Sequence, residues 1–102
     1  MTTMNPWMPE RSPVTLRRVG KKGEEASELA KVCFRIVIQG IDGIDPANGK
    51  TNRQALQDEI ADVLAQCDIS IDEFDLDRDA IAQRVLKKKA QMAEWESLVS
   101  GA

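Results

Sequence analysis

Four acidic residues occur in two pairs whose spacing could serve a single chemical purpose. Glu25 and Glu28 form an ExxE pair, and Glu59 and Asp62 form an ExxD pair later in the chain. Residues three apart lie on nearly the same face of a helix, so the members of each pair project together. Four carboxylates that converge repel one another and need a compensating cation. Oxygen ligands without histidine or cysteine nearby favour a hard ion, Mg²⁺ or alternatively Mn²⁺.

The chemistry that such an ion supports is the hydrolysis of a phosphoanhydride. A carboxylate-bound divalent ion can clamp a triphosphate, neutralise charge in the transition state and lower the pKa of a bound water. Phosphoryl chemistry depends mainly on positioning and charge neutralisation, so it requires no covalent nucleophile. The chain contains no histidine, which removes the commonest general base and the commonest zinc ligand.

The same acids are also compatible with an ordinary solvated helix surface. In that interpretation Glu25 forms an exposed ion pair with Lys21 or Lys22. Glu28 would likewise pair with Lys31 or Lys22. A metal site therefore requires that two helices bring their acidic edges together.

Helical periodicity predicts a helix from residue 14 to about residue 38, which carries the first acidic pair. Apolar side chains recur there on one face, namely Leu29, Val32, Cys33, Ile36 and Val37. Phe34 and Ile38 point roughly the opposite way, so this end is apolar on two sides and suggests a subunit interface. Gly20 and Gly23 weaken the preceding stretch, and we expect a kink or break near them.

A second predicted helix carries the second acidic pair. It follows a loop over residues 40–50 that is rich in glycine and other breakers. Thr51 can cap this helix in a capping box with Gln54, and the helix should run to about Asp68. Its apolar stripe consists of Leu56, Ile60, Val63, Leu64 and Cys67. Each acidic pair borders the apolar stripe of its helix, so antiparallel packing of the stripes would bring the pairs together.

A third helix and an N-terminal arm complete the predicted chain. Ser70 with Glu73 suggests a cap, and four aspartates place negative charge near the helix start, namely Asp72, Asp75, Asp77 and Asp79. Residues 1–13 contain three prolines and predict a flexible arm. The expected fold class is all-α, with residues 14–102 forming a helical bundle completed by homo-oligomerisation.

Composition narrows the classes of partner. The net charge of −3 argues against a nucleic-acid binder, which usually carries a basic field. The longest apolar stretch is too short and too charged to span a membrane, so no membrane partner is expected. Cys33 and Cys67 fall within apolar helical patterns and are expected to be buried thiols. Two cysteines without a CxxC motif favour a reducing, cytoplasmic setting.

The residues around the acidic pairs resemble a known family. The segments KKGEEASEL at residues 21–29 and DEIADVL at residues 58–64 resemble the all-α NTP pyrophosphohydrolase superfamily, in its MazG-like branch. That superfamily is marked by ExxE, a spacer and then ExxD. The spacer between Glu28 and Glu59 is long for the family, and the breaker-rich loop accounts for the excess. The resemblance extends over roughly residues 14–98.

The resemblance implies a fold, an activity and a ligand set. It implies a helical bundle assembled as a homodimer or homotetramer. The implied activity is Mg²⁺-dependent hydrolysis of a nucleoside triphosphate, such as a dNTP or a non-standard NTP, to the monophosphate and pyrophosphate. Glu25, Glu28, Glu59 and Asp62 would hold the metal, and one of them would orient the attacking water.

Members of the superfamily also carry a basic residue in the last helix, often with an amide four residues later. Lys87 with Gln91 matches that spacing, although asparagine is the more usual amide. Lys88 or Arg84 could face the phosphates instead. Lys21 is a further candidate for the substrate site, and an ion pair with Glu25 is its alternative role.

Two other functions remain open from the sequence. One is a phosphoribosyl-ATP pyrophosphatase-like enzyme of the same superfamily, for which the residues around ExxD fit less well. The other is a non-catalytic helical dimerisation or binding protein that keeps its acids for solubility and ion pairs.

Overall fold

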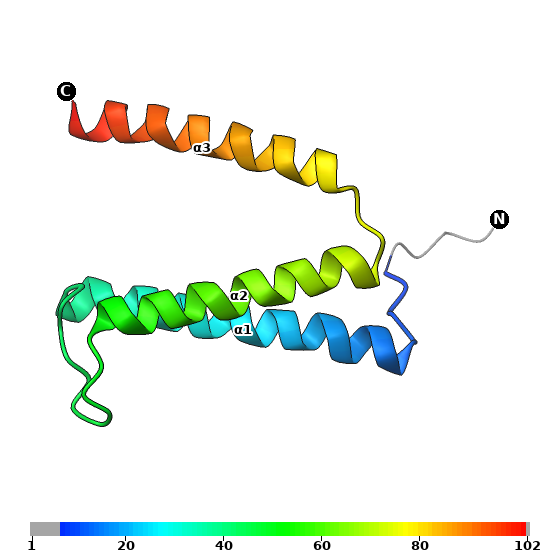
Figure 1. Ribbon diagram of the computed structural model, residues 1–102, viewed down its shortest axis with the longest axis horizontal. Helices are drawn as coiled ribbons and strands as arrows, with labels where there is room; N and C mark the ends of the chain where they lie inside the picture. The colour runs from blue at the N-terminus through cyan, green and yellow to red at the C-terminus, as the bar shows by residue number, and fades with distance from the viewer. Residues whose placement is uncertain (1–6, 102) are drawn as a thin grey trace. The chain divides into compact units, whose positions relative to one another are not determined.

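The computed structural model describes residues 7–101, which contain three α-helices and no β-strand (Figure 1). They are α1 (Pro13–Gln39), α2 (Asn52–Glu73) and α3 (Arg78–Ser100). The all-α prediction is therefore confirmed for this part of the chain. The chain divides into two compact units, residues 1–69 and residues 70–102. Residues 1–6 of the predicted arm lie outside the described part, and residues 7–12 have no regular secondary structure.

Helix α1 is continuous. The Ser12 hydroxyl accepts a hydrogen bond from the Thr15 backbone N–H at 3.2 Å, which caps the helix start. The prediction of a kink or break near Gly20 and Gly23 is wrong, because the helix runs unbroken through both. Each glycine costs only about 1 kcal/mol relative to alanine, which cooperative extension of a long, packed helix can offset. The helix ends at Gly40, which adopts a φ of 86°.

The loop after α1 is held by hydrogen bonds to the start of α2. Asn52 is buried, and its side-chain Nδ2 donates to the Gly40 carbonyl at 2.8 Å while its backbone N–H donates to Gly43. A Cβ at Gly43 would lie 2.7 Å from the Gln39 carbonyl oxygen, so only glycine fits there. The predicted capping box is confirmed, because Thr51 N–H donates to Gln54 Oε1 and Gln54 N–H donates to Thr51 Oγ1.

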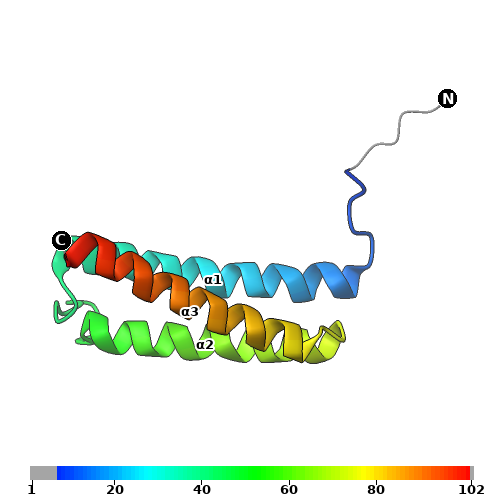
Figure 2. The same ribbon diagram turned by 90° about the horizontal axis from the view of Figure 1, so that it is seen from above.

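Helices α1 and α2 run antiparallel and side by side over the first unit (Figures 1 and 2). Their less exposed positions alternate in steps of three and four residues, as in a coiled-coil seam. On α1 this seam contains Lys22, Glu25, Leu29, Val32 and Ile36. On α2 it contains Asn52, Leu56, Glu59, Val63 and Gln66. One member of each acidic pair thus occupies a seam position.

The seam is narrower than the predicted apolar stripes. Val32 is the one buried apolar residue of the described chain. Cys33 and Cys67 are exposed free thiols, so the prediction that they are buried is wrong. The seam alternates three- and four-residue steps and leaves these neighbouring positions on the outside. On α1, Val37 is 83% exposed and Ile38 82% exposed, which leaves an apolar surface uncovered.

Helix α3 begins later than predicted. The side chain of Asp77 caps it by accepting a hydrogen bond from the Ala80 N–H at 3.0 Å. Ser70 and Glu73 do not cap a third helix, because both belong to the last turns of α2. Apart from Ile81, every side chain of α3 is exposed. Within residues 7–101, none of the three helices has the length and apolar character to cross a membrane.

Candidate metal centre

The first acidic seam residue is Glu25, which lies in the middle of α1. Its side chain is 17% exposed, whereas that of the neighbouring Glu24 is 62% exposed. Lys21 Nζ lies 3.3 Å from Glu25 Oε1 and 3.2 Å from Glu24 Oε1. The ion pair that the sequence offered for Lys21 is therefore present, and a phosphate contact by Lys21 stays a prediction.

The second acidic seam residue is Glu59 on α2. Its Oε2 atom is buried and has no hydrogen-bond partner among the described residues. Burial raises the pKa of Glu59 above its ordinary value, and repulsion from Asp62 and then Glu25 raises the pKa further, with smaller contributions from Glu28 and Asp58. An unpartnered buried carboxylate oxygen is costly, so this position favours a ligand that supplies positive charge.

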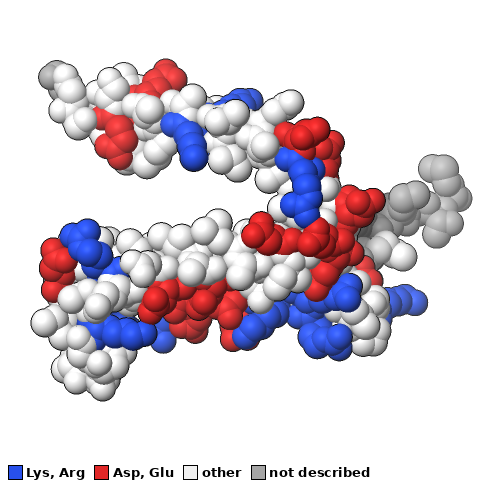
Figure 3. Space-filling model, viewed as in Figure 1, with Lys and Arg blue, Asp and Glu red and all other residues white. Residues whose placement is uncertain are grey.

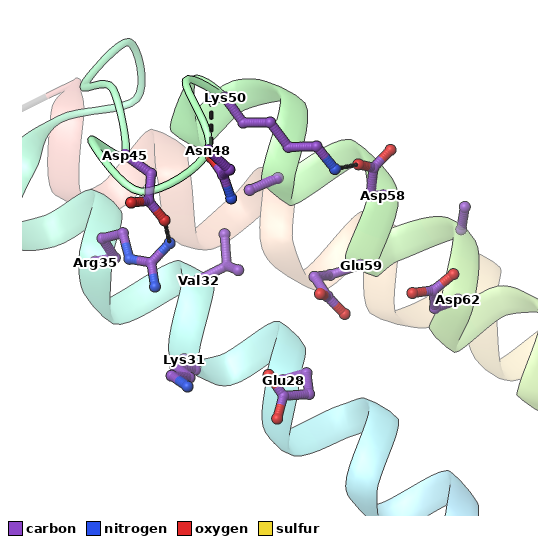
Figure 4. Close-up of a pocket in the computed structure, with 12 residues that line it drawn as sticks. Glu28, Lys31, Val32, Arg35, Asp45, Asn48, Lys50, Asp58, Glu59 and Asp62 are labelled. Carbon is purple, nitrogen blue, oxygen red and sulfur yellow. Dashed lines mark hydrogen bonds and ion pairs between the residues drawn. The ribbon is translucent and has the colours of Figure 1, made fainter.

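Three of the four predicted ligands converge between the helices. One carboxylate oxygen each from Glu25, Glu59 and Asp62 lies within 4.8 Å of the others. Glu28, one turn further along α1, is outside this group, although it lines a groove together with Glu59 and Asp62. Figure 4 shows Glu28 on α1, and Glu59 and Asp62 on the side of α2 that faces α1. The ExxE and ExxD motifs thus meet in space, as antiparallel packing predicts.

The donor set fits a hard divalent cation. Three carboxylate oxygens within 4.8 Å of one another need only small side-chain movements to reach the distances of about 2.1 Å that Mg²⁺ prefers, and water or a phosphate oxygen can complete an octahedral shell. Glu28 is exposed and has no ion pair or hydrogen bond within residues 7–101, so its side chain is free to turn toward such an ion. If the acids served only in structural ion pairs, the buried Glu59 oxygen would have a cationic partner, and among the described residues it has none.

A groove of about 550 Å³ adjoins the acids and lies entirely within the first unit. Residues from α1, the loop and α2 line it, and Figure 4 labels ten of them. The lining includes three cationic side chains that sequence reasoning did not place in the site, namely Lys31, Arg35 and Lys50. The position of Lys31, three residues after Glu28 on the same helix face, was the signal that could have identified it.

Acidic and basic side chains occupy separate areas on the surface of the first unit. In Figure 3 acidic side chains gather along the lower edge of the α1–α2 pair, between basic side chains at either end. An anion that carries a bound cation meets both signs of charge on such a surface.

The predicted substrate residues of the last helix belong to the second unit. They are Arg84, Lys87, Lys88 and Gln91. All four side chains are exposed on α3, and none of them lines the groove of the first unit. Their contact with substrate stays a prediction from the family resemblance.

Comparisons with known proteins do not identify a family. No protein-family model matches this chain, and no curated protein and no solved structure matches it either. The resemblance to the MazG-like enzymes rests on the two acidic motifs and their neighbours alone.

Proposed function

We propose that this protein is a Mg²⁺-dependent nucleoside triphosphate pyrophosphohydrolase of the MazG-like type, with Mn²⁺ as an alternative ion. The observation that carries the proposal is the convergence of Glu25, Glu59 and Asp62 around an unpartnered buried carboxylate oxygen. Acidic side chains that are partly buried between two helices need a positive charge or a proton to compensate them. The open groove beside them has room for a polyphosphate.

In the proposed reaction the acidic residues would bind the metal ion and orient the attacking water. A bound Mg²⁺ would neutralise the phosphate charge and lower the pKa of a water. Glu25, Glu59 and Asp62 would fix the position of the ion, and Glu28 would join them on binding. One of the four carboxylates would orient the water that attacks between the α and β phosphates, so that the products are a nucleoside monophosphate and pyrophosphate.

The same proposal includes a homo-oligomer, either a dimer or a tetramer. Phe34, Val37 and Ile38 present a largely exposed apolar surface on α1, although this helix is otherwise rich in charge. Contiguous exposed apolar side chains of this kind mark association surfaces. Sedimentation equilibrium of the full chain should give a multiple of the 11.3 kDa monomer mass. A monomer at micromolar concentration would contradict this part of the proposal.

The test of the activity is a substrate panel with detection of pyrophosphate. Ribonucleotide and deoxyribonucleotide triphosphates, non-standard triphosphates and phosphoribosyl-ATP should be incubated with the protein and Mg²⁺. We expect pyrophosphate release from at least one of them, its loss in EDTA and its loss in Glu59→Gln. Asp68→Asn removes an exposed acid of the same helix and serves as the matched control.

The panel also separates the rival functions. Preference for phosphoribosyl-ATP would assign the histidine-pathway type of reaction. Activity that persists in EDTA would contradict a metal mechanism. A helical binding protein without catalysis would show no pyrophosphate release, and Mg²⁺ with a nucleotide analogue would leave its melting temperature unchanged.

A further inference from the structure

Three cationic side chains line the groove, and they differ in how their charge is already used. Arg35 Nη1 lies 3.4 Å from Asp45 Oδ2, and Lys50 Nζ lies 2.9 Å from Asp58 Oδ2. Lys31 takes part in no ion pair within residues 7–101. Among the described residues, Lys31 is therefore the groove cation whose charge is not already paired with a carboxylate.

Hydrogen bonds within the loop over residues 40–50 fix the backbone positions of its groove-lining residues. The Asp45 N–H donates to the Lys50 carbonyl at 2.8 Å, and the Lys50 N–H donates to Asn48 Oδ1 at 2.9 Å. Arg35 ties the loop to α1 through Asp45. Figure 4 shows Asn48 and Lys50 in the lining of the groove, beside the acids of α2. The backbone of Lys50 is thus held by hydrogen bonds, while its side chain is 54% exposed.

Lys50 is electrostatically coupled to the candidate metal centre. Its hydrogen bond to Asp58 raises the pKa of the Lys50 ammonium first, and Glu59 and Asp62 raise the pKa further. Lys50 also lines the same groove as Glu59 and Asp62, so an anion in this groove can contact both the lysine and an ion held by the acids. Asp58 itself lines the groove together with Glu59, so the ion pair that holds Lys50 lies at the edge of the space proposed for the phosphates.

We propose that Lys31 and Lys50 hold the polyphosphate tail of the substrate on the loop side of the groove. This inference rests on the proposed function and adds binding residues on α1 and the loop to those expected on the last helix. A metal chelated by a triphosphate leaves several phosphate oxygens charged, and those oxygens need donors on the side away from the carboxylates. Lys31 and Lys50 are the exposed cations of the groove, whereas Arg35 is less exposed and links α1 to the loop through Asp45.

The test uses inorganic tripolyphosphate, which isolates tail binding from recognition of the base. Its affinity in the presence of Mg²⁺ should be measured by calorimetry for the wild-type protein, Lys31→Gln and Lys50→Gln. Arg17→Gln is the charge-matched control, because it lies on α1 about 21 Å along the axis from Lys31. Mn²⁺ affinity measured by electron paramagnetic resonance, without polyphosphate, provides a readout that is independent of catalysis.

We expect Lys31→Gln to weaken tripolyphosphate binding about tenfold and Lys50→Gln about fivefold, with Lys31→Arg near wild type. Arg17→Gln should change the affinity less than about twofold because solvent and salt screen its charge. Mn²⁺ affinity should stay constant in Lys31→Gln and rise slightly in Lys50→Gln, since the loss of an ammonium favours a competing cation. A merely structural role for Lys50 does not produce this opposite pair of changes.

Three results would overturn the inference. Unchanged binding in Lys31→Gln, or an equal loss in Arg17→Gln, would show that no localised tail site exists. In both cases Mn²⁺ binding and pyrophosphate release would leave the proposed function standing. Absence of both Mn²⁺ binding and pyrophosphate release from the wild-type protein would remove the proposed function, and this inference with it.

Discussion

The α1–α2 pair and α3 carry charge at similar density but use it differently. Between α1 and α2, acids occupy seam positions, where Glu25 is mostly buried and one Glu59 oxygen lacks a partner. In α3 every charged side chain is exposed to solvent. The comparison teaches that residue type alone does not make a site. Charges interact strongly, and the pKa values of acids shift, where helix packing shields the side chains from water.

The largest expected effect tests whether the seam position matters more than the acid itself. If the proposed activity is present, Glu25→Gln should lower Mg²⁺-dependent pyrophosphate release at least ~100-fold, because it removes a charged ligand of the proposed metal site. Glu24→Gln removes the same charge from the adjacent exposed position and should change the rate less than about twofold. Steady-state rates at saturating Mg²⁺ make the measurement. Equal losses in the two variants would abolish the distinction between seam and surface.

The next effect concerns stability rather than rate. Glu59→Leu replaces a repelled, partly buried carboxylate by an apolar side chain and should raise the melting temperature of the metal-free protein by about 5 °C. The same variant should lose the rise in melting temperature that Mg²⁺ gives the wild type. Glu96→Leu on exposed α3 is the control and should not stabilise the protein. A lower melting temperature for Glu59→Leu would show that the free protein compensates this carboxylate internally.

A smaller effect should follow from changes in α3. Lys87→Gln combined with Lys88→Gln should weaken the binding of a non-hydrolysable nucleotide about fivefold, as expected for lost exposed phosphate contacts. Mn²⁺ affinity should be unchanged, because neither lysine supplies an oxygen to the proposed metal site. Calorimetry and electron paramagnetic resonance separate the two readouts. Unchanged nucleotide binding would remove α3 from the substrate site.

The smallest effect involves one ionisation. The pKa of Glu59 in the folded protein is raised above its ordinary value of 4.5, so the folded state holds this proton more tightly than the unfolded state. The resulting stability is fully present below about pH 4.5 and is lost as pH rises through the raised pKa. Without metal, the wild type should therefore lose stability relative to Glu59→Gln across that interval, in thermal melts at matched pH. Mg²⁺ should offset the loss.

Much of the fold follows from local sequence. Three helices, the Thr51–Gln54 capping box and the loop between the first two helices were all predictable from the sequence. Caps and turns depend on residues within a few positions of one another. The start of α3 was predicted too early because several serine and aspartate residues near it are equally good caps. Because α2 continues to Glu73, the earlier candidates lie within that helix, and Asp77 is the residue that caps α3.

The sequence by itself determined that each acidic pair shares a helix face and that the pairs could meet. Only the tertiary structure decided that Glu25 and Glu59 lie in the seam, that Glu28 lies beside it, and that Cys33 and Cys67 face outward. The tertiary structure also brought Lys50 of the loop to the acids of α2. Helix periodicity is a local property, but the choice of which face is buried depends on the partner helix and its register.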